Sequence, residues 1–334
     1  MSTILAAPDK FRGSASAREV AAGVAAAADA VGWSCVQLPL ADGGEGTLDA
    51  FGGANRSTTV TGPLGGRVDA AWRLGDDGVA VVESALASGL VLAGGAEGND
   101  PVRATSRGTG QLVAAAIAGG ARRVIVSLGG SATTDGGLAT VEELDAYAPF
   151  DGRDGRPEVL VACDVRTRFR DAAVVFGPQK GASPEQVVEL TARLDGLADR
   201  YRQRYGIDLS AVDGSGAAGG LGGALAALGA RLVPGFELVA EHTGLAEAVR
   251  AADAVITGEG RLDAQSFNGK VVGGVVDLAA RYGVPALVLA GLVDDDVADR
   301  VESVSLIARF GPELSWRDPV GCVTQAAEQW LRGR

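Results

Sequence analysis

The sequence has very few of the residues that several common reaction types need. It contains one histidine, His242, so Ser-His-Asp triads and histidine-based metal sites have almost no material to work with. Its three cysteines, Cys35, Cys163 and Cys322, are far apart and follow no metal-ligand spacing. Isolated thiols are typical of a reducing compartment, so we expect a cytoplasmic protein.

Long apolar runs are also missing. The alanine-rich run 21–30 contains Asp29 and is too short to span a bilayer, and the charges of Asp9 and Lys10 come too early for a signal peptide. The formal net charge is −12, and an acidic surface repels nucleic acid and anionic membranes. We therefore expect neither a nucleic-acid nor a membrane partner, and a small anionic substrate would need a local basic pocket.

What the chain does have is a repeated alternation of short apolar runs with helical patterns. This alternation is typical of an α/β fold with largely parallel strands. The predicted strands cover residues 3–7, 35–40, 79–83, 123–128, 159–163, 254–257, 286–290 and 305–308. The predicted helices cover residues 16–31, 108–119, 184–204, 219–228, 269–282 and 319–332.

The length of 334 residues suggests two domains. The last predicted strands and helices resemble the first in style, and the threonine-rich, glycine-broken segment 56–74 indicates irregular or antiparallel structure at a domain crossing. We therefore predict a discontinuous domain formed by residues 1–60 plus 250–334, with a Rossmann/flavodoxin-like parallel sheet. Residues 61–249 form the predicted inserted α/β domain.

Glycine-rich segments with charged side chains directly follow the first two predicted strands. In a parallel sheet, residues just past the carboxyl end of a strand line the ligand crevice. DKFRGS contains Lys10 and Arg12, which would suit a carboxylate or phosphate; the alternative is a solvated turn before a helix cap. DGGEGT contains Asp42 and Glu45; the alternative is a tight turn whose acids begin a helix.

A third segment, GGSATTDGG, follows the strand predicted to end at residue 128. Backbone N–H groups beside small hydroxyl residues form anion-binding nests, and Asp135 offers a carboxylate to Mg²⁺. Ser106 would add to the same anion site, whereas the alternative is a connection without a ligand. The predicted nest consists of Gly129, Gly130, Ser131 and Thr133.

Two further glycine-rich segments carry weaker motifs. Gly214, Gly216 and Gly219 match G-x-G-x-x-G, but no strong strand precedes them, and close packing on small residues explains them equally well. TGEGRLDAQSFNGK ends in Gly-Lys like a Walker A motif, yet Val271 replaces the Ser or Thr that binds magnesium. The latter segment is therefore not a P-loop, but a loop this rich in charge after a buried strand indicates a site.

Two shorter segments each add one charged residue to the candidate site. Asp164 follows a predicted strand, and Lys180 lies in a rigid turn before a capped helix, where the alternative is an exposed turn lysine. The segments together supply many carboxylates, several cations and glycine nests, but no histidine base. This combination suits phosphoryl transfer, which depends on positioning and charge neutralisation. A carboxylate near the acceptor can take its proton.

The order of these segments resembles the bacterial glycerate kinase family of the glycerate 2-kinase type. DKFRGS, DGGEGT, TSRGTG, GGSATTDGG, CDV, GPQKGA, GSGAAGGLG and TGEGRLDAQSFNGK follow one another with the family's spacing over most of the chain. The resemblance implies two α/β domains with a cleft between them. It also implies transfer of the γ-phosphoryl group of ATP, with Mg²⁺, to D-glycerate, giving 2-phosphoglycerate or 3-phosphoglycerate.

The resemblance also implies a candidate site. Asp263 or Asp42 would orient the acceptor hydroxyl, and lysines would neutralise the substrate carboxylate and the phosphates. The candidates are, as catalytic residues, Asp42, Asp263, Lys10 and Lys270; for the substrate, Arg12, Glu45, Ser106, Arg261 and Ser266; for the nucleotide, Gly129, Gly130, Ser131, Thr133, Lys180 and Gly216; and for the metal, Asp135 and Asp164.

The sequence departs from the family pattern in three places. The stretch between Gly137 and Asp164 is shorter by roughly a helix and a strand. Thr134 and Arg107 replace an asparagine and a tyrosine, and residues 166–168 (RTR) replace an asparagine-proline pair. The new arginines would either accept a more anionic hydroxy acid than glycerate or lie on the surface.

Three alternatives to a glycerate kinase stay open from the sequence. One is a kinase for a different small hydroxy acid. Another is an NAD-dependent oxidoreductase that uses the G-x-G-x-x-G motif, and the third is a non-catalytic relative that binds a metabolite. A homodimer is one assembly that the sequence leaves open.

Overall fold

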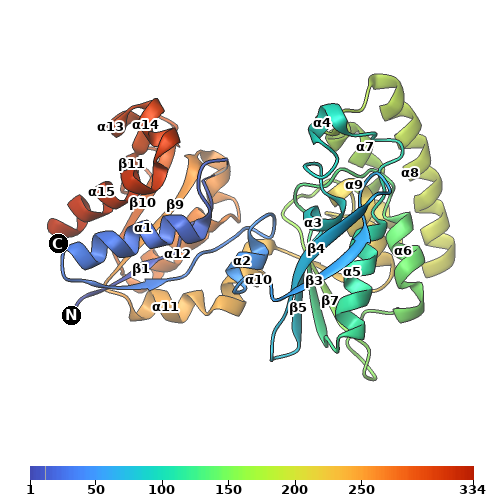
Figure 1. The fold of residues 1–334 in the computed structure, drawn as a ribbon, viewed down its shortest axis with the longest axis horizontal. Helices are drawn as coiled ribbons and strands as arrows, with labels where there is room; N and C mark the ends of the chain where they lie inside the picture. The colour runs from blue at the N-terminus through green and yellow to red at the C-terminus, as the bar shows by residue number, and fades with distance from the viewer. Residues whose placement is uncertain (12) are drawn as a thin grey trace. The chain divides into compact units, whose positions relative to one another are not determined.

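The computed structural model describes residues 1–11 and 13–334, so the predicted substrate-binding residue Arg12 lies outside the described residues. The chain divides into two compact units, which we call the terminal unit and the inserted unit (Figure 1). The terminal unit comprises Met1–Asp42, Asp49–Phe51 and Phe236–Arg334. The inserted unit comprises Gly43–Leu48 and Gly52–Gly235.

The terminal unit is built on a five-stranded parallel sheet with the strand order β11-β10-β9-β1-β2. Its central strands are nearly continuous apolar runs, as expected for a sheet covered on both faces. Its strands are β1 (Thr3–Ala6), β2 (Ser34–Gln37), β9 (Ala254–Leu262), β10 (Ala286–Val293) and β11 (Ser303–Ser305).

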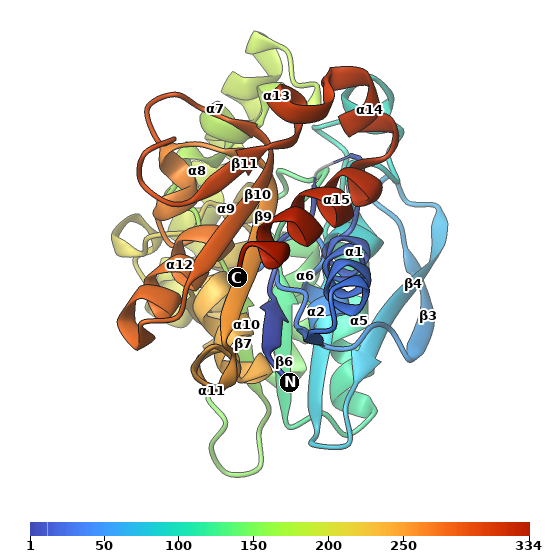
Figure 2. The same ribbon diagram turned by 90° about the vertical axis from the view of Figure 1, so that its left-hand side faces the viewer.

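Helices cover both faces of this sheet. One buried cluster joins the sheet to α1 (Ala17–Ala30) and α15 (Pro319–Arg332), which lie side by side in Figure 2, and another joins it to α12 (Val271–Tyr282). Ser16 and Glu19 form the predicted capping box at the start of α1. The remaining helices here are α10 (Gly235–Thr243), α11 (Leu245–Ala251), α13 (Leu306–Phe310) and α14 (Pro312–Arg317), and α2 (Thr47–Ala50) lies where the chain changes unit.

The strand order of the terminal unit contains a reversal. From β1 the chain moves outward to β2 on one side, whereas β9 leads outward through β10 to β11 on the other side. The neighbours β1 and β9 therefore flank a topological switch point. Open α/β sheets bind their ligands at the carboxyl ends of the strands at such a point.

The inserted unit contains a six-stranded sheet with the order β3-β4-β5-β6-β7-β8. The pairs β3–β4 and β4–β5 are antiparallel, which confirms the antiparallel option for segment 56–74, and the other pairs are parallel. The strand order follows the chain without reversal. The strands are β3 (Arg56–Thr61), β4 (Arg67–Leu74), β5 (Val79–Glu83), β6 (Arg123–Ser127), β7 (Glu158–Ala162) and β8 (Arg231–Val233).

A single large apolar core joins this sheet to its helices. Ser183 caps α8 with its side chain, and Pro184 occupies the first helical position, as predicted. The helices are α3 (Ala85–Ser88), α4 (Gly95–Gly98), α5 (Arg107–Ala118), α6 (Leu138–Leu144), α7 (Ala172–Phe176), α8 (Pro184–Tyr205) and α9 (Ala217–Ala227). The predicted α/β class is thus confirmed for both units.

Three sequence predictions need correction. The strand predicted at 254–257 continues to Leu262, so the first part of the charged segment predicted as a loop belongs to β9. The strand predicted at 305–308 ends at Ser305, whose hydroxyl accepts a hydrogen bond from the Ala308 N–H and so begins α13. The helix predicted at 219–228 begins at Ala217, and its first turn is distorted by positive φ angles at Ala218 and the two glycines that follow.

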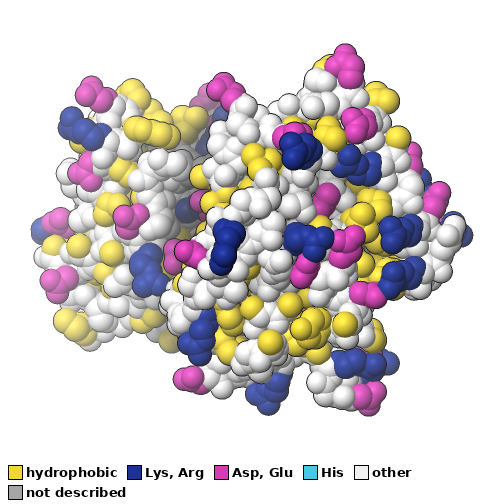
Figure 3. Space-filling view, turned by 45° about the vertical axis from the view of Figure 1, so that its right-hand side comes forward, with side chains coloured by type: hydrophobic (Ala, Val, Ile, Leu, Met, Phe, Trp, Pro, Cys, Tyr) yellow, Lys and Arg dark blue, Asp and Glu magenta, His cyan; other side chains and the backbone are white. Residues whose placement is uncertain are grey.

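The surface is of mixed charge. Figure 3 shows acidic and basic side chains interspersed on the face that it presents. Within residues 1–11 and 13–334, no helix is both long enough and apolar enough to traverse a lipid bilayer.

Candidate functional site

A pocket of about 390 Å³ lies in the terminal unit, at the carboxyl ends of its parallel strands. The loop after β1 and the end of β9 both line it, so the pocket lies at the topological switch point. One part of the lining is charged and consists of Asp9, Lys10, Asp42, Glu259, Arg261, Asp263 and Lys270. Another part is apolar and consists of Phe11, Ile307, Pro312 and Trp316.

The four residues predicted to be catalytic all line this pocket, although they come from separate segments of the chain. Lys10 follows β1, Asp42 follows β2, Asp263 follows β9, and Lys270 precedes α12. Among the predicted substrate-binding residues, Arg261 also lines the pocket.

Two acids of this pocket, Asp9 and Glu259, were not among the site residues predicted from the sequence. Burial raises the pKa of Asp9 to about 6, and repulsion from Asp42 adds to the shift. Burial raises the pKa of Glu259 to about 7, with repulsion from Asp9 and Asp263 in the same direction. The buried Glu259 Oε1 has no hydrogen-bond partner among the described residues, and a buried oxygen without a donor is a place for a proton or a cation.

The raised pKa of Glu259 predicts how stability depends on pH. A carboxyl group with a raised folded-state pKa stabilises the fold below its unfolded-state pKa of 4.5, and this contribution is lost as pH rises through about 7. Glu259→Gln should therefore be more stable than the wild type above pH 7, by roughly 2 kcal/mol. Urea unfolding at several pH values tests this; a stability difference that does not grow from acid to neutral pH would contradict it.

The Asp263 carboxylate is fixed in place by the backbone that follows it. Its Oδ1 accepts hydrogen bonds from the N–H groups of Gln265 (2.8 Å) and Ser266 (3.2 Å), and the Ser266 hydroxyl accepts one from the Asp263 N–H (3.0 Å). This capping box begins the short 3₁₀ helix Ala264–Phe267. The predicted substrate-binding residue Ser266 thus holds Asp263 at the pocket.

Two cationic side chains of the pocket, those of Arg261 and Lys270, differ in their hydrogen-bond partners. The Arg261 guanidinium binds the Asp294 carboxylate through Nε (3.0 Å) and Nη2 (2.9 Å). Lys270 is the N-cap residue of α12, and its ammonium makes no hydrogen bond or ion pair within the described residues. The N-terminus of a helix adds partial positive charge, so Lys270 and α12 together offer a place for an anion.

The remaining predicted residues lie in the inserted unit. The loop that contains Glu45 is tied down by the buried Glu83 at the end of β5, whose Oε1 accepts hydrogen bonds from the N–H groups of Gly46 (3.1 Å) and Leu48 (2.7 Å). The same loop touches the end of β6, because a Cβ added to Gly129 would lie 3.0 Å from the Gly44 Cα.

The start of this loop lies beside the chain that follows β7 and β8. A Cβ added to Gly43 would lie 2.6 Å from the Gly235 Cα, and the Gly235 N–H donates to the exposed Asp164 carboxylate (2.8 Å). The structure therefore brings Glu45, Gly129 and Asp164 to the carboxyl ends of the parallel strands of the inserted unit.

Lys180 is not the exposed turn lysine that the sequence left as an alternative. Its side chain is buried, and its ammonium donates to the Ser131 hydroxyl (3.0 Å) and the Thr133 carbonyl (2.6 Å). Burial lowers the pKa of Lys180 to about 7, against the opposing effect of Asp135. In this structure, Lys180 therefore holds the predicted nucleotide loop through its side chain.

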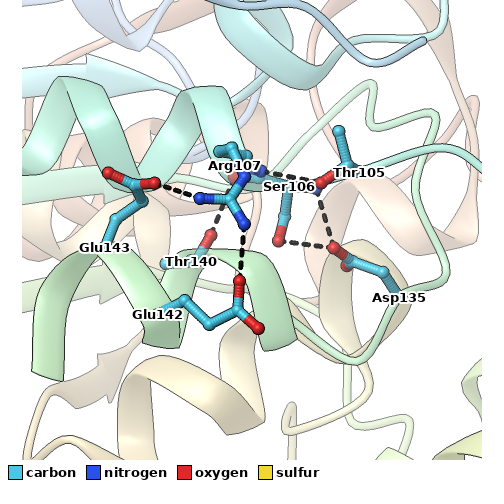
Figure 4. A network of polar contacts seen from close by, with 7 residues as sticks. All are labelled: Thr105, Ser106, Arg107, Asp135, Thr140, Glu142 and Glu143. Atoms are coloured by element: carbon cyan, nitrogen blue, oxygen red, sulfur yellow. Dashed lines mark hydrogen bonds and ion pairs between the residues drawn. The ribbon is translucent and has the colours of Figure 1, made fainter. Parts of the chain in front are cut away.

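Ser106 and Asp135 bind each other (Figure 4). The Ser106 N–H and hydroxyl both donate to Asp135 Oδ2 at 2.8 Å, and Gly137 N–H donates to Oδ1 at 3.0 Å. The neighbouring Arg107, one of the departures from the family pattern, forms ion pairs with Glu142 and Glu143 of α6. This network joins the start of α5 to the GGSATTDGG segment.

The two predicted metal ligands differ in their surroundings. Both oxygens of Asp135 already accept hydrogen bonds from the protein, and burial raises the pKa of its carboxyl group. Asp164 is exposed, and its Oδ1 accepts a hydrogen bond from the Gly235 N–H (2.8 Å). Among the described residues, no group of three or more acids, histidines or cysteines is arranged as a metal cage. This holds for the terminal pocket too, although its lining includes four carboxylates and Glu259 Oε1, which has no hydrogen-bond partner among the described residues.

The G-x-G-x-x-G segment follows no strand; the chain before it is α8 and the 3₁₀ turn Leu209–Ala211. Gly216 donates its N–H to the Thr167 carbonyl (2.9 Å), and a Cβ there would lie 2.4 Å from the Arg168 carbonyl oxygen. Close packing of backbone therefore explains this glycine, and the strand that a dinucleotide fingerprint needs is absent before it in the described chain.

A compositional signal in the sequence could have pointed to these loops. The chain contains 27 arginines but only three lysines, Lys10, Lys180 and Lys270. Two of the lysines line the terminal pocket, and the third is buried against the GGSATTDGG segment. A lysine ammonium is a compact charge and an arginine guanidinium is planar, so the two are not interchangeable. Because lysine occurs only at these three positions, we infer that each of them requires an ammonium group.

Comparisons with known proteins agree on one family. The sequence model described as the glycerate kinase family matches residues 4–157 and 147–329, and the two matched parts overlap at residues 147–157, within the shortened stretch. A glycerate 2-kinase from Escherichia coli (strain K12) is 41% identical over 329 residues, covering 88% of this chain and 86% of the relative. A glycerate kinase from Bacillus subtilis (strain 168) is 38% identical over 328 residues, with coverages of 88% and 86%.

A solved structure shows the same fold. The crystal structure of a proposed glycerate kinase 2 from Salmonella typhimurium LT2 has a TM-score of 0.80 and 33% sequence identity, and the match covers 100% of this chain and 99% of that one. This chain belongs to the glycerate kinase family.

Proposed function

We propose that this protein is an ATP-dependent glycerate kinase, which transfers the γ-phosphoryl group of ATP to D-glycerate and releases 2-phosphoglycerate and ADP. Membership of the glycerate kinase family supports the reaction. The observation that carries the choice of site is that all four predicted catalytic residues line one pocket at the switch point of the terminal sheet.

The charges of the pocket suit phosphoryl transfer, which is catalysed mainly by positioning and by neutralising charge. Lys10, Lys270 and the N-terminus of α12 would neutralise the phosphates. Asp263, fixed by its capping box, would orient the acceptor hydroxyl and accept its proton, with Asp42 as the second candidate. The half-buried acids Asp9 and Glu259 would provide carboxylate oxygens for a divalent cation.

Mg²⁺ fits the acids of this pocket better than the predicted pair Asp135 and Asp164. Mg²⁺ is usually held by one or two carboxylates together with phosphate oxygens and water, and Glu259 Oε1 is a buried oxygen that lacks a partner among the described residues. We propose that Glu259 and Asp9 hold the ion that accompanies ATP. When bound, it would neutralise charge on the phosphates.

Chelation tests this part of the proposal. Excess EDTA should abolish ADP formation in the presence of ATP and D-glycerate, and excess Mg²⁺ should restore it, because the phosphates need a divalent cation. Glu259→Gln should need a higher Mg²⁺ concentration for half-maximal rate, whereas Glu328→Gln, on the surface of α15, should not. Full activity in EDTA would contradict the role of the metal.

The function itself is tested by a substrate screen. Purified protein with Mg-ATP should form ADP with D-glycerate faster than with other small hydroxy acids. Two of the new arginines do not favour a more anionic acid, because Arg107 is paired with Glu142 and Glu143, and Arg168 with Asp213 (3.5 Å). Stabilisation by glycerate without turnover would instead support the non-catalytic alternative.

The setting of this enzyme is part of the same proposal. We expect it to act in the cytoplasm on small molecules, without a membrane or nucleic-acid partner, in line with its three isolated cysteines and its net charge of −12. We propose the two structural units as its two domains, and a homodimer as the assembly to test first by light scattering.

A further inference from the structure

The terminal pocket has an apolar side that phosphoryl transfer alone does not explain. The charged residues come from the strand ends and from the start of α12, whereas α13 and α14 contribute Ile307, Pro312 and Trp316. A phosphoryl group, a metal ion and glycerate are all small and polar, so none of them needs an apolar wall. The pocket therefore suits a ligand with an apolar end against this wall and a charged end among the acids and lysines.

Trp316 is unusual in being 67% exposed while lining a pocket. Trp316 lies on the short helix α14, which begins at Pro312 and in which the Ser315 hydroxyl donates to the Gly311 carbonyl (2.8 Å). The edge of its ring reaches the loop after β1, since a Cβ added to Gly13 would lie 3.5 Å from Trp316 Cη2. An exposed aromatic ring at a pocket is a surface on which a planar ligand can stack.

We propose that Trp316 stacks on the nucleobase of ATP, with Ile307 and Pro312 completing the wall, and that the triphosphate extends toward Lys10 and Lys270. This inference rests on the proposed function, because ATP is its phosphoryl donor. It places the nucleotide in the terminal unit. In the inserted unit, the ammonium and hydroxyl groups predicted to bind it are turned inward and bonded to the protein, as for Lys180 and Ser131.

Steady-state kinetics of two variants test this placement. Trp316→Ala should raise KM for ATP about tenfold or more, the size expected for loss of base–aromatic stacking, and should leave KM for D-glycerate unchanged. Trp316→Phe should recover most of the loss, because a smaller aromatic ring still stacks. An unchanged KM for ATP in Trp316→Ala, or a rise in KM for D-glycerate instead, would overturn the proposal.

Nucleotide binding without glycerate separates this inference from the proposed function. Titration with ADP should quench tryptophan fluorescence in the wild type and in the control Trp330→Phe, which changes a tryptophan bonded to Glu302 away from the pocket lining. Trp316→Phe should lose the quenching. Quenching at Trp316 in a protein that does not phosphorylate glycerate would support the nucleotide site and refute the proposed function. Quenching that persists in Trp316→Phe would overturn the site.

Because the chain has only three lysines, a reagent that labels lysine near the bound nucleotide can show which unit binds ATP. ATP whose ribose has been oxidised to the dialdehyde forms an imine with a nearby lysine amine, releasing water, and borohydride reduces the imine to a stable secondary amine. Peptide mapping should find the label on Lys10 or Lys270, and Trp316→Ala should reduce it. A label that ATP protects at Lys180 would place the nucleotide in the inserted unit and overturn the proposal.

Discussion

Asp263→Asn is expected to lower kcat for glycerate phosphorylation by about 10²–10⁴-fold, the usual effect of losing a positioned acid or base. Asparagine is an equally good N-cap residue, so the short helix that Asp263 begins should survive and the fold should be intact. Lys270→Ala should cause a loss of similar size, because it removes a cation at the N-terminus of α12. Turnover at saturating substrates and circular dichroism measure the two effects.

The chain offers a matched control for Asp263→Asn. Asp208 is also the N-cap residue of a 3₁₀ turn and accepts a hydrogen bond from the Ser210 N–H (3.0 Å), but it is exposed and lies in the inserted unit. Asp208→Asn should therefore keep full activity. Near-normal turnover in both Asp263→Asn and Lys270→Ala would remove this pocket from the reaction.

Gly219→Ala is expected to destabilise the protein by roughly 3–5 kcal/mol, enough to lower its yield of folded protein. Gly219 has φ +67°, and an added Cβ would lie 2.0 Å from the Thr133 carbonyl oxygen and 2.6 Å from the Thr134 Cα. Both neighbours are backbone and cannot move aside cheaply. The measurement is the free energy of unfolding in urea.

The same substitution at Gly196 should have the opposite sign. Gly196 lies inside α8, is exposed, and has no atom within 4 Å of an added Cβ. Gly196→Ala should therefore stabilise the helix by about 0.5–1 kcal/mol. If Gly219→Ala were as stable as the wild type, the close packing of the two glycine-rich segments in the inserted unit would be wrong.

The sequence predicted which loops contain the candidate site residues, but it did not predict which of these loops lie in the same structural unit. Strand ends followed by glycines and charges can be read along the chain, and Asp42, Asp263 and Lys10 do line one pocket. The boundary between the units, however, falls inside the motif DGGEGT, between Asp42 and Gly43. Which loop belongs to which unit depends on contacts far apart in sequence, and a local pattern does not contain these.

Burial was the other property that the sequence could not supply. The turn around Lys180 has the composition of an exposed turn, but Ser131 and Thr133, nearly fifty residues away, provide the acceptors that bury its ammonium. The apolar run after Ser305 suggests a strand by composition, and one hydroxyl cap makes it a helix instead. Trp316 belongs to no recognisable sequence motif, and only the structure shows that it lines the pocket.

Two departures from the family pattern differ in how well the structure accommodates them. Arg107 forms ion pairs with Glu142 and Glu143, residues of the shortened stretch itself. The Thr134 hydroxyl, where the family has an asparagine, is buried and lacks a hydrogen-bond partner among the described residues. Both residues lie in the inserted unit, and neither lines the terminal pocket.

Phosphorus NMR of the complete reaction is the most direct measurement of the central claim. With wild-type protein, Mg-ATP and D-glycerate, we expect the ATP resonances to give way to those of ADP and of one phosphomonoester that matches 2-phosphoglycerate. The new ester should be absent without glycerate and nearly absent with Asp263→Asn. Inorganic phosphate as the only product, or an ester that Asp263→Asn forms at the normal rate, would contradict the account.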